Sequence, residues 1–119
     1  MNHSRLELQA IFEKIMHSIW AEIPDDRRGS VEDYSNHVYF QPGSNITMQY
    51  PAIVYERDSS DSTFADNVPY YYQHRYTITV IDKDPDSAIP DKVAHLPMTI
   101  MDRHFVSDNM HHDVFLMYF

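Results

Sequence analysis

Histidine is the residue type whose numbers first suggest chemistry in this chain. Eight histidines occur among 119 residues, and His104, His111 and His112 lie close to Asp113 near the C-terminus. Imidazole and carboxylate groups are common ligands of transition metals. The spacing matches no known ligand motif, and adjacent His111 and His112 would point to opposite faces of a strand. The pattern therefore favours solvated or interface histidines over a metal site.

The acidic run Asp82–Asp86 resembles the beginning of a calcium-binding loop, with aspartates at alternate positions. The glycine that such a loop needs at its sixth position is Ser87, and the closing glutamate at its twelfth is Val93. Acidic residues just before a helix also cap its first turn and interact with its dipole. We interpret the run as a turn and helix start rather than as a calcium site.

Catalytic motifs are missing from the sequence. The chain has no cysteine and no G-x-S-x-G motif, and its only glycines are Gly29 and Gly43. So few glycines exclude a phosphate-binding loop and a dinucleotide-binding fingerprint. The sequence predicts neither an enzyme nor a bound cofactor or metal.

Charge and hydropathy narrow the possible partners. The formal net charge is -9, and the densest basic pair is Arg27-Arg28. Nucleic-acid binders and proteins that adhere to anionic membranes need clustered basic residues, so neither class is expected. No apolar run approaches the roughly 20 residues of a membrane span, and charged residues interrupt the first twenty positions. The absence of cysteine fits a cytosolic origin.

The longest regular pattern predicts a half-buried strand over Tyr70–Asp82. Tyr72, Tyr76, Ile78 and Val80 share one face, and polar residues occupy the other. The polar stretch Arg57–Asn67 before it has no periodicity and predicts an exposed loop between two strands.

The remaining elements complete an α+β domain over residues 1–119: a small mixed or antiparallel sheet, with an N-terminal helix and a second short helix packed on it. Ser4–Ala21 has a capping box and apolar residues at helical spacing, which predicts a core-facing helix. A second, short helix is expected at 87–96, with Pro90 in its first turn. Short strands are expected at 37–40 and after Pro51, and a hairpin around Asp108-Asn109. The apolar C-terminal run should lie inside the sheet or against another subunit.

Six segments between Val38 and Phe119 form a distinctive combination: Tyr50–Tyr55, Phe64–Asn67, Tyr76–Asp82, Asp84–Ser87, Ile89–Asp91 and Phe105–Phe115. Together they resemble tail-terminator proteins of long-tailed bacteriophages, also called minor tail or tail-completion proteins. The N-terminal helix fits the layout of this family but carries no distinctive motif.

The resemblance implies a structural virion protein that forms a hexameric ring at the head-proximal end of the tail tube. Such a ring is assembled in the host cytoplasm, stops tube polymerisation and joins the tail to the head. Its expected partners are further copies of the chain, the major tail tube protein and the head–tail connector protein. DNA is expected to pass through the lumen without specific binding.

Contacts with a neighbouring subunit or the tube are expected on the stretch from Arg57 to the beginning of the long strand, where tyrosines are in surplus. The candidate interface residues are Asp58, Asp61, Phe64, Asp66, Asn67, Tyr70, Tyr71 and Arg75. Two alternatives remain at this point: another neck component, such as a head–tail adaptor or stopper, and a small metal-binding protein that uses the histidine-rich end.

Overall fold

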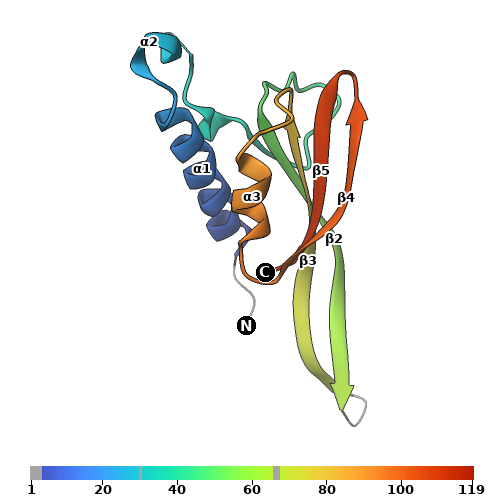
Figure 1. Cartoon of the computed structure of the whole chain (residues 1–119). Coiled ribbons are helices and arrows are strands. Elements are labelled where there is room, and N and C mark those ends of the chain that lie inside the picture. The colour runs from blue at the N-terminus through green and yellow to red at the C-terminus, as the bar shows by residue number, and fades with distance from the viewer. Residues whose placement is uncertain (1–3, 30, 66–67) are drawn as a thin grey trace.

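A five-stranded mixed sheet with helices on one face forms the body of the protein (Figure 1). The computed structural model describes residues 4–29, 31–65 and 68–119; between 59 and 73 it describes the course of the main chain but no side chains. The elements are α1 (Arg5–Ala21), α2 (Asp25–Arg28), the 3-10 turn η1 (Tyr34–Asn36), β1 (Val38–Phe40), β2 (Ala52–Ala65), β3 (Val68–Asp82), α3 (Ile89–Ala94), β4 (Thr99–Ser107) and β5 (Met110–Tyr118). The predicted α+β class is confirmed.

The strand order is β1-β2-β3-β5-β4, so β5 lies between β3 and β4. Strand β1 runs parallel to β2, and the other neighbours are antiparallel. One cross-strand row joins Phe40, Tyr55, Ile78, Phe115 and Met101 from edge to edge. The insertion of β5 confirms that the apolar C-terminal strand is internal to the sheet, and it leaves β4 as an edge.

Helix α1 packs its apolar stripe on the sheet, as its sequence pattern predicts. The Ser4 side chain accepts a hydrogen bond from the Glu7 main-chain nitrogen, which is the expected N-cap. Leu8, Phe12 and Met16 are completely buried on the side of the helix that faces the sheet. Helix formation and core packing therefore depend on the same stripe.

Tyr55 lies at the centre of the contact between α1 and the sheet. Its buried ring is 5.1 Å from the Phe12 ring and 5.0 Å from the Phe40 ring, centroid to centroid. Its hydroxyl donates to Gln9 Oε1 and accepts from Arg5 Nη1 at 3.3 Å. Burial raises the pKa of Tyr55, although the neighbouring Arg5 opposes the shift. The hydroxyl is thus held neutral and paired inside the core.

The C-terminal end of α1 is covered by the segment that follows it. The Arg28 guanidinium lies 4.6 Å from the Trp20 ring centroid, and Trp20 Nε1 donates to the Val31 carbonyl at 3.0 Å. His17 Nδ1 is 2.6 Å from Asp33 Oδ2. The hydrogen bond from the Ser35 main-chain nitrogen, and then the contact with His17, lower the pKa of Asp33. These contacts hold Arg28, Val31 and Asp33 against the helix.

The predicted loop over Arg57–Asn67 is wrong for most of its length, because β2 continues to Ala65 and β3 begins at Val68. Among the described residues no strand pairs with β2 beyond Tyr55 on its β1 side, and β5 pairing begins only at Arg75. The hairpin therefore projects from the sheet as a two-stranded ribbon, which we call the arm (residues 58–65 and 68–74), and the molecule measures 62 × 29 × 26 Å. The segment Arg57–Ala65 has no apolar alternation, so its sequence resembles a loop although its main chain forms a strand.

The other predicted elements are confirmed with small shifts in their ends. Strand β2 begins directly after Pro51, and the short helix α3 has Pro90 in its first turn and Pro97 beyond its end. Asp108 and Asn109 have φ values of 54° and 62°, as a tight two-residue hairpin turn requires.

Removal of the Phe12 ring should be far more costly than removal of the Tyr55 hydroxyl. Phe12→Ala leaves a cavity under α1 and should lower the free energy of unfolding by about 3–5 kcal/mol. Tyr55→Phe keeps the ring and loses only its two hydrogen bonds, at a cost of about 1 kcal/mol. Urea unfolding of both variants measures the difference, and equal losses would contradict the central role of ring packing.

Asp33 gives a pH-dependent contribution to stability. Because its pKa is lowered in the folded state, the stabilisation is complete above the ordinary value of 3.8 and disappears as the pH falls through the lower folded value. Asp33→Asn should therefore melt at a lower temperature than the wild type at pH 6, and the gap should close as the pH falls below about 4. A gap that stays constant from pH 6 to pH 3 would show that the carboxylate charge is not involved.

Candidate functional site

Asp58 and Arg75, two of the predicted interface residues, meet at the root of the arm. Arg75 Nη2 lies 3.2 Å from Asp58 Oδ2, and Thr77 Oγ1 donates to the same oxygen at 2.8 Å. A hydrogen bond with Tyr118 raises the pKa of Arg75, and the Asp58 carboxylate adds to the shift. Arg75 thus joins β2, β3 and β5 where the arm leaves the sheet.

The other six predicted interface residues are only partly placed. Asp61, Phe64, Tyr70 and Tyr71 lie on the main chain of the arm strands. Their side chains are not among those that the structure describes, and Asp66 and Asn67 lie outside the described residues altogether. Their interface role stays a prediction.

Strand β4 forms an open edge of the sheet that the sequence patterns did not predict. All of this strand except Thr99 is exposed, although it carries several large apolar side chains. Ile100 is 62% exposed, Val106 58%, Met101 48% and Phe105 39%. A long edge strand with apolar side chains is a surface on which another strand can pair. The missed signal was the run from Met98 to Met101, which continues the predicted hairpin strand beyond its polar middle.

The histidine side chains near the C-terminus lie on both faces of the sheet, as predicted for the adjacent residues His111 and His112 of a strand. On the helix-bearing face, His104 Nδ1 is 2.8 Å from Asp113 Oδ1, and His104 Nε2 is 3.4 Å from His111 Nδ1. On the other face, His112 stacks on Phe105 with ring centroids 4.6 Å apart. Among the described residues, no group of three or more histidine, aspartate or glutamate side chains is placed to hold a metal ion.

The acidic turn after β3 uses its carboxylates on its own main chain. Asp82 Oδ1 accepts from the Asp84 nitrogen at 3.1 Å, and Asp84 Oδ1 accepts from the Asp86 nitrogen at 2.9 Å. Ser87 Oγ then accepts from the Ile89 nitrogen at 3.2 Å, just before α3. These bonds agree with the interpretation of the run as a turn and helix start.

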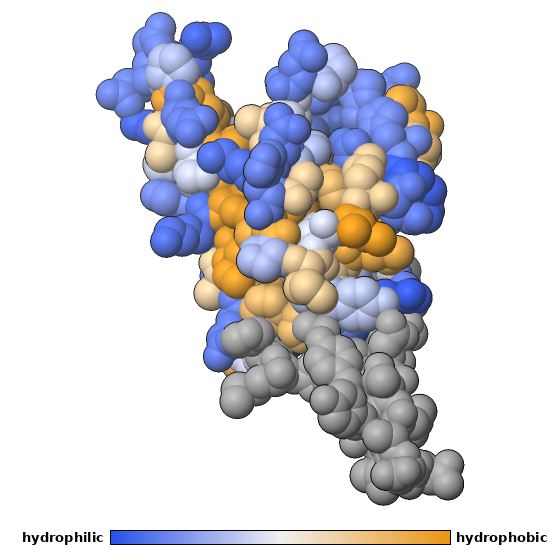
Figure 2. Space-filling view, turned by 60° about the horizontal axis from the view of Figure 1, so that its bottom comes forward, coloured by the Kyte–Doolittle hydropathy of each residue, from blue (hydrophilic) through white to orange (hydrophobic). Residues whose placement is uncertain are grey.

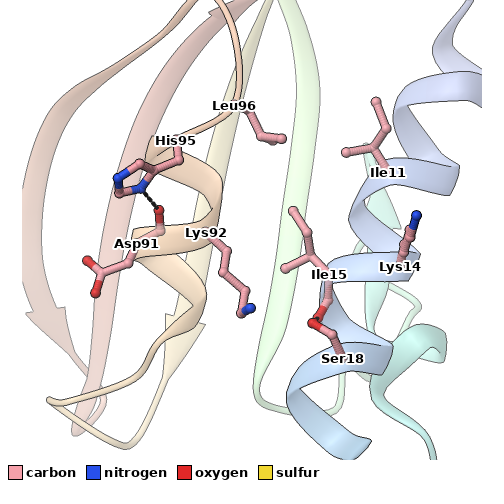
Figure 3. Close-up of a pocket in the computed structure, with 8 residues that line it drawn as sticks. All are labelled: Ile11, Lys14, Ile15, Ser18, Asp91, Lys92, His95 and Leu96. Atoms are coloured by element: carbon pink, nitrogen blue, oxygen red, sulfur yellow. Dashed lines mark hydrogen bonds between the residues drawn. The ribbon is translucent and has the colours of Figure 1, made fainter.

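A groove of about 670 Å³ separates α1 from α3 (Figure 3). Ile11 and Ile15 point into it from α1, and Leu96 points toward them from the end of α3. His95 turns back to its own helix and donates from Nδ1 to the Asp91 carbonyl at 2.6 Å. Figure 2 shows apolar side chains gathered over the middle of this side of the molecule, bordered by hydrophilic ones. The groove has the character of a packing surface, because its polar groups do not converge on one point.

Comparisons with known proteins give no relative for this chain. Searches against protein-family models, curated proteins and solved structures returned no match. Within the described residues, no helix combines the length and the hydropathy needed to cross a membrane.

The ion pair at the root of the arm should make a small and salt-sensitive contribution. Asp58 and Arg75 are 35% and 29% exposed, so water screens their attraction. A double-mutant cycle with Asp58→Asn and Arg75→Gln should give a coupling energy of about 0.5 kcal/mol in urea unfolding. Added salt should reduce it, and a coupling that 1 M NaCl leaves unchanged would show that hydrogen-bond geometry dominates over charge.

Proposed function

We propose that this chain is a structural subunit of a phage tail terminator, which forms a ring at the head-proximal end of the tail tube and joins the tail to the head. The arm is the observation that carries the proposal. It projects beyond the sheet as a two-stranded ribbon with no helix or further strand described against it. An isolated ribbon of this kind is only marginally stable in water, and contact with another molecule would stabilise it.

The distribution of charge and apolar surface supports the same proposal. Apolar side chains are exposed on an edge strand and half-buried in the groove between the helices, as suits a subunit that buries surface only on assembly. The net charge of -9 suits a channel through which DNA slides, because like charges repel. The sequence resemblance supplies the specific role within the tail.

A tube-capping experiment tests the role. Purified protein is mixed with tail tubes that lack their terminator and is examined by negative-stain electron microscopy. Rings at one end of each tube, and tubes that no longer lengthen when tube protein is added, are the expected result. Binding to isolated connectors without any effect on tubes would favour a head–tail adaptor or stopper instead.

Shortening the arm should abolish capping without unfolding the protein. Replacing residues 62–72 with Asn-Gly places a two-residue turn between Asp61 and Gln73, which are paired in the sheet. The main-chain groups of Gln73 face β2, because the His74 carbonyl accepts from the Phe119 nitrogen just after β5. The variant should keep the circular dichroism spectrum of a folded α+β protein and lose tube capping. Glu22→Gln, an exposed change at the end of α1, is the matched control and should cap normally. Normal capping by the shortened variant would refute the role of the arm.

A further inference from the structure

The open main-chain groups of β4 can be located residue by residue. The Tyr118 nitrogen donates to the Met98 carbonyl at 3.1 Å, which makes Thr99 and Met117 a non-hydrogen-bonded pair. The N–H and C=O of Thr99, and those of Met101 two residues later, therefore point away from β5. The two-residue turn after Ser107 makes Ser107 and Met110 a hydrogen-bonded pair. On that side of the bulge at Asp102, the main-chain groups that point away from β5 therefore belong to Val106 and His104.

The two faces of β4 are equally well defined. Thr99, Met101, His104 and Val106 lie opposite Met117, Phe115, Asp113 and His111, which share the helix-bearing face. Ile100, Arg103 and Phe105 lie opposite Leu116, Val114 and His112 on the other face. The residues with outward main-chain groups are thus the same residues whose side chains lie on the helix-bearing face.

We propose that β4 binds β4 of a second copy of this chain, antiparallel about a two-fold axis, so that two sheets join into one. Placing the axis between Asp102 and Arg103 sets Thr99 opposite Val106 of the second copy and Met101 opposite its His104. Each of these residues has outward main-chain groups, so each pair can exchange hydrogen bonds. The axis also sets the two bulges opposite each other, so neither interrupts the pairing.

Side chains on both faces match in this register. Ile100 lies opposite Phe105 of the second copy, which covers the most exposed apolar side chain of the strand, Ile100 at 62%, with an aromatic ring. Asp102 lies opposite Arg103 of the second copy, and Arg103 opposite its Asp102. Within one chain, Arg103 Nη1 already lies 2.5 Å from Asp102 Oδ2, so pairing creates a neutral group of four alternating charges. The edge is complementary to itself in hydrogen bonding, apolar contact and charge.

This contact is separate from the proposed tail function. A two-fold contact closes after two copies and leaves the arm of each copy free, whereas a ring needs a contact between different surfaces of successive copies. The pairing covers β4 in the free protein whether or not the chain belongs to a phage tail. A failure of tube capping therefore leaves it untouched.

Charge reversal at the axis tests the register. The wild type should be a dimer by light scattering coupled to size-exclusion chromatography. Asp102→Arg or Arg103→Asp alone places like charges opposite each other and should weaken the dimer by about tenfold or more. The double swap Asp102→Arg with Arg103→Asp restores opposite charges across the axis and should restore the dimer. Both side chains are exposed, so unchanged melting curves are expected for the monomeric form of each variant.

Cysteine cross-linking tests the same register directly, because the natural chain contains no cysteine. A chain carrying both Ile100→Cys and Phe105→Cys should form a disulfide-linked dimer under mild oxidation, since non-hydrogen-bonded opposite pairs are close enough to bridge. Five residues of strand separate the two positions within one chain by about 16 Å, so they cannot bridge internally. Each single variant should stay uncross-linked.

Replacing an apolar side chain with lysine tests the apolar part of the contact. Ile100→Lys should give a monomer, whereas Leu6→Lys, at a comparably exposed apolar position on α1, should leave the dimer intact. A monomeric wild type at 100 μM would overturn the proposal. So would a dimer that neither single charge reversal weakens, or one that cross-links equally well through either single cysteine.

Discussion

The packing of α1 on Tyr55 is the contact on which the rest of the structure depends. Its ring lies between residues from the helix and from two strands, and its hydroxyl is paired with Arg5 and Gln9 at the beginning of α1. Because these partners all lie on one face, α1 packs on that face of the sheet, where the short helix α3 adds Ile89 and Val93 to the same core. The body of the protein is therefore a two-layer structure, and its outer face and edges are left to meet water or other molecules.

The row of residues through Tyr55 also explains where burial ends. It passes from Phe40 through Ile78 and Phe115, all within the helical cover, and reaches Met101 on β4. The residues at the centre of the row are buried, whereas Met101 at its end is half exposed. At Met101 the edge thus continues the core row beyond the part that the helices cover.

The sequence predicted the elements that bury one face and expose the other. The helix over Ser4–Ala21, the strand ending at Asp82 and the turn at Asp108-Asn109 each have a local signal, because periodicity and turn residues report on burial and φ directly. The β2 half of the arm has no such signal, because Arg57–Ala65 is polar and shows no alternation, whereas the β3 half from Tyr70 belongs to the strand that the sequence predicted. Strand pairing there depends on the main chain and on cross-strand contacts such as that of Asp58 with Arg75.

The exposure of β4 could not be read from its own residues at all. Ile100 and Val106 have the character of core residues, and they are exposed only because β5 is inserted between β3 and β4. Strand order is a property of the whole chain, whereas a sequence pattern covers a few residues. For the same reason both members of the Asp58–Arg75 pair could be named in advance as interface candidates, but not their contact with each other.

The position of Trp20 gives the protein a built-in optical reporter. It is the only tryptophan, its ring is covered by Arg28, and its N–H is paired with the Val31 carbonyl. Trp20 lies near the C-terminal end of α1, and Figure 1 shows α1 and β4 on opposite sides of the molecule. The Trp20 fluorescence should therefore change when the helical layer unfolds and should not change when another strand pairs with β4. Unfolding and assembly can thus be recorded as separate signals in one sample.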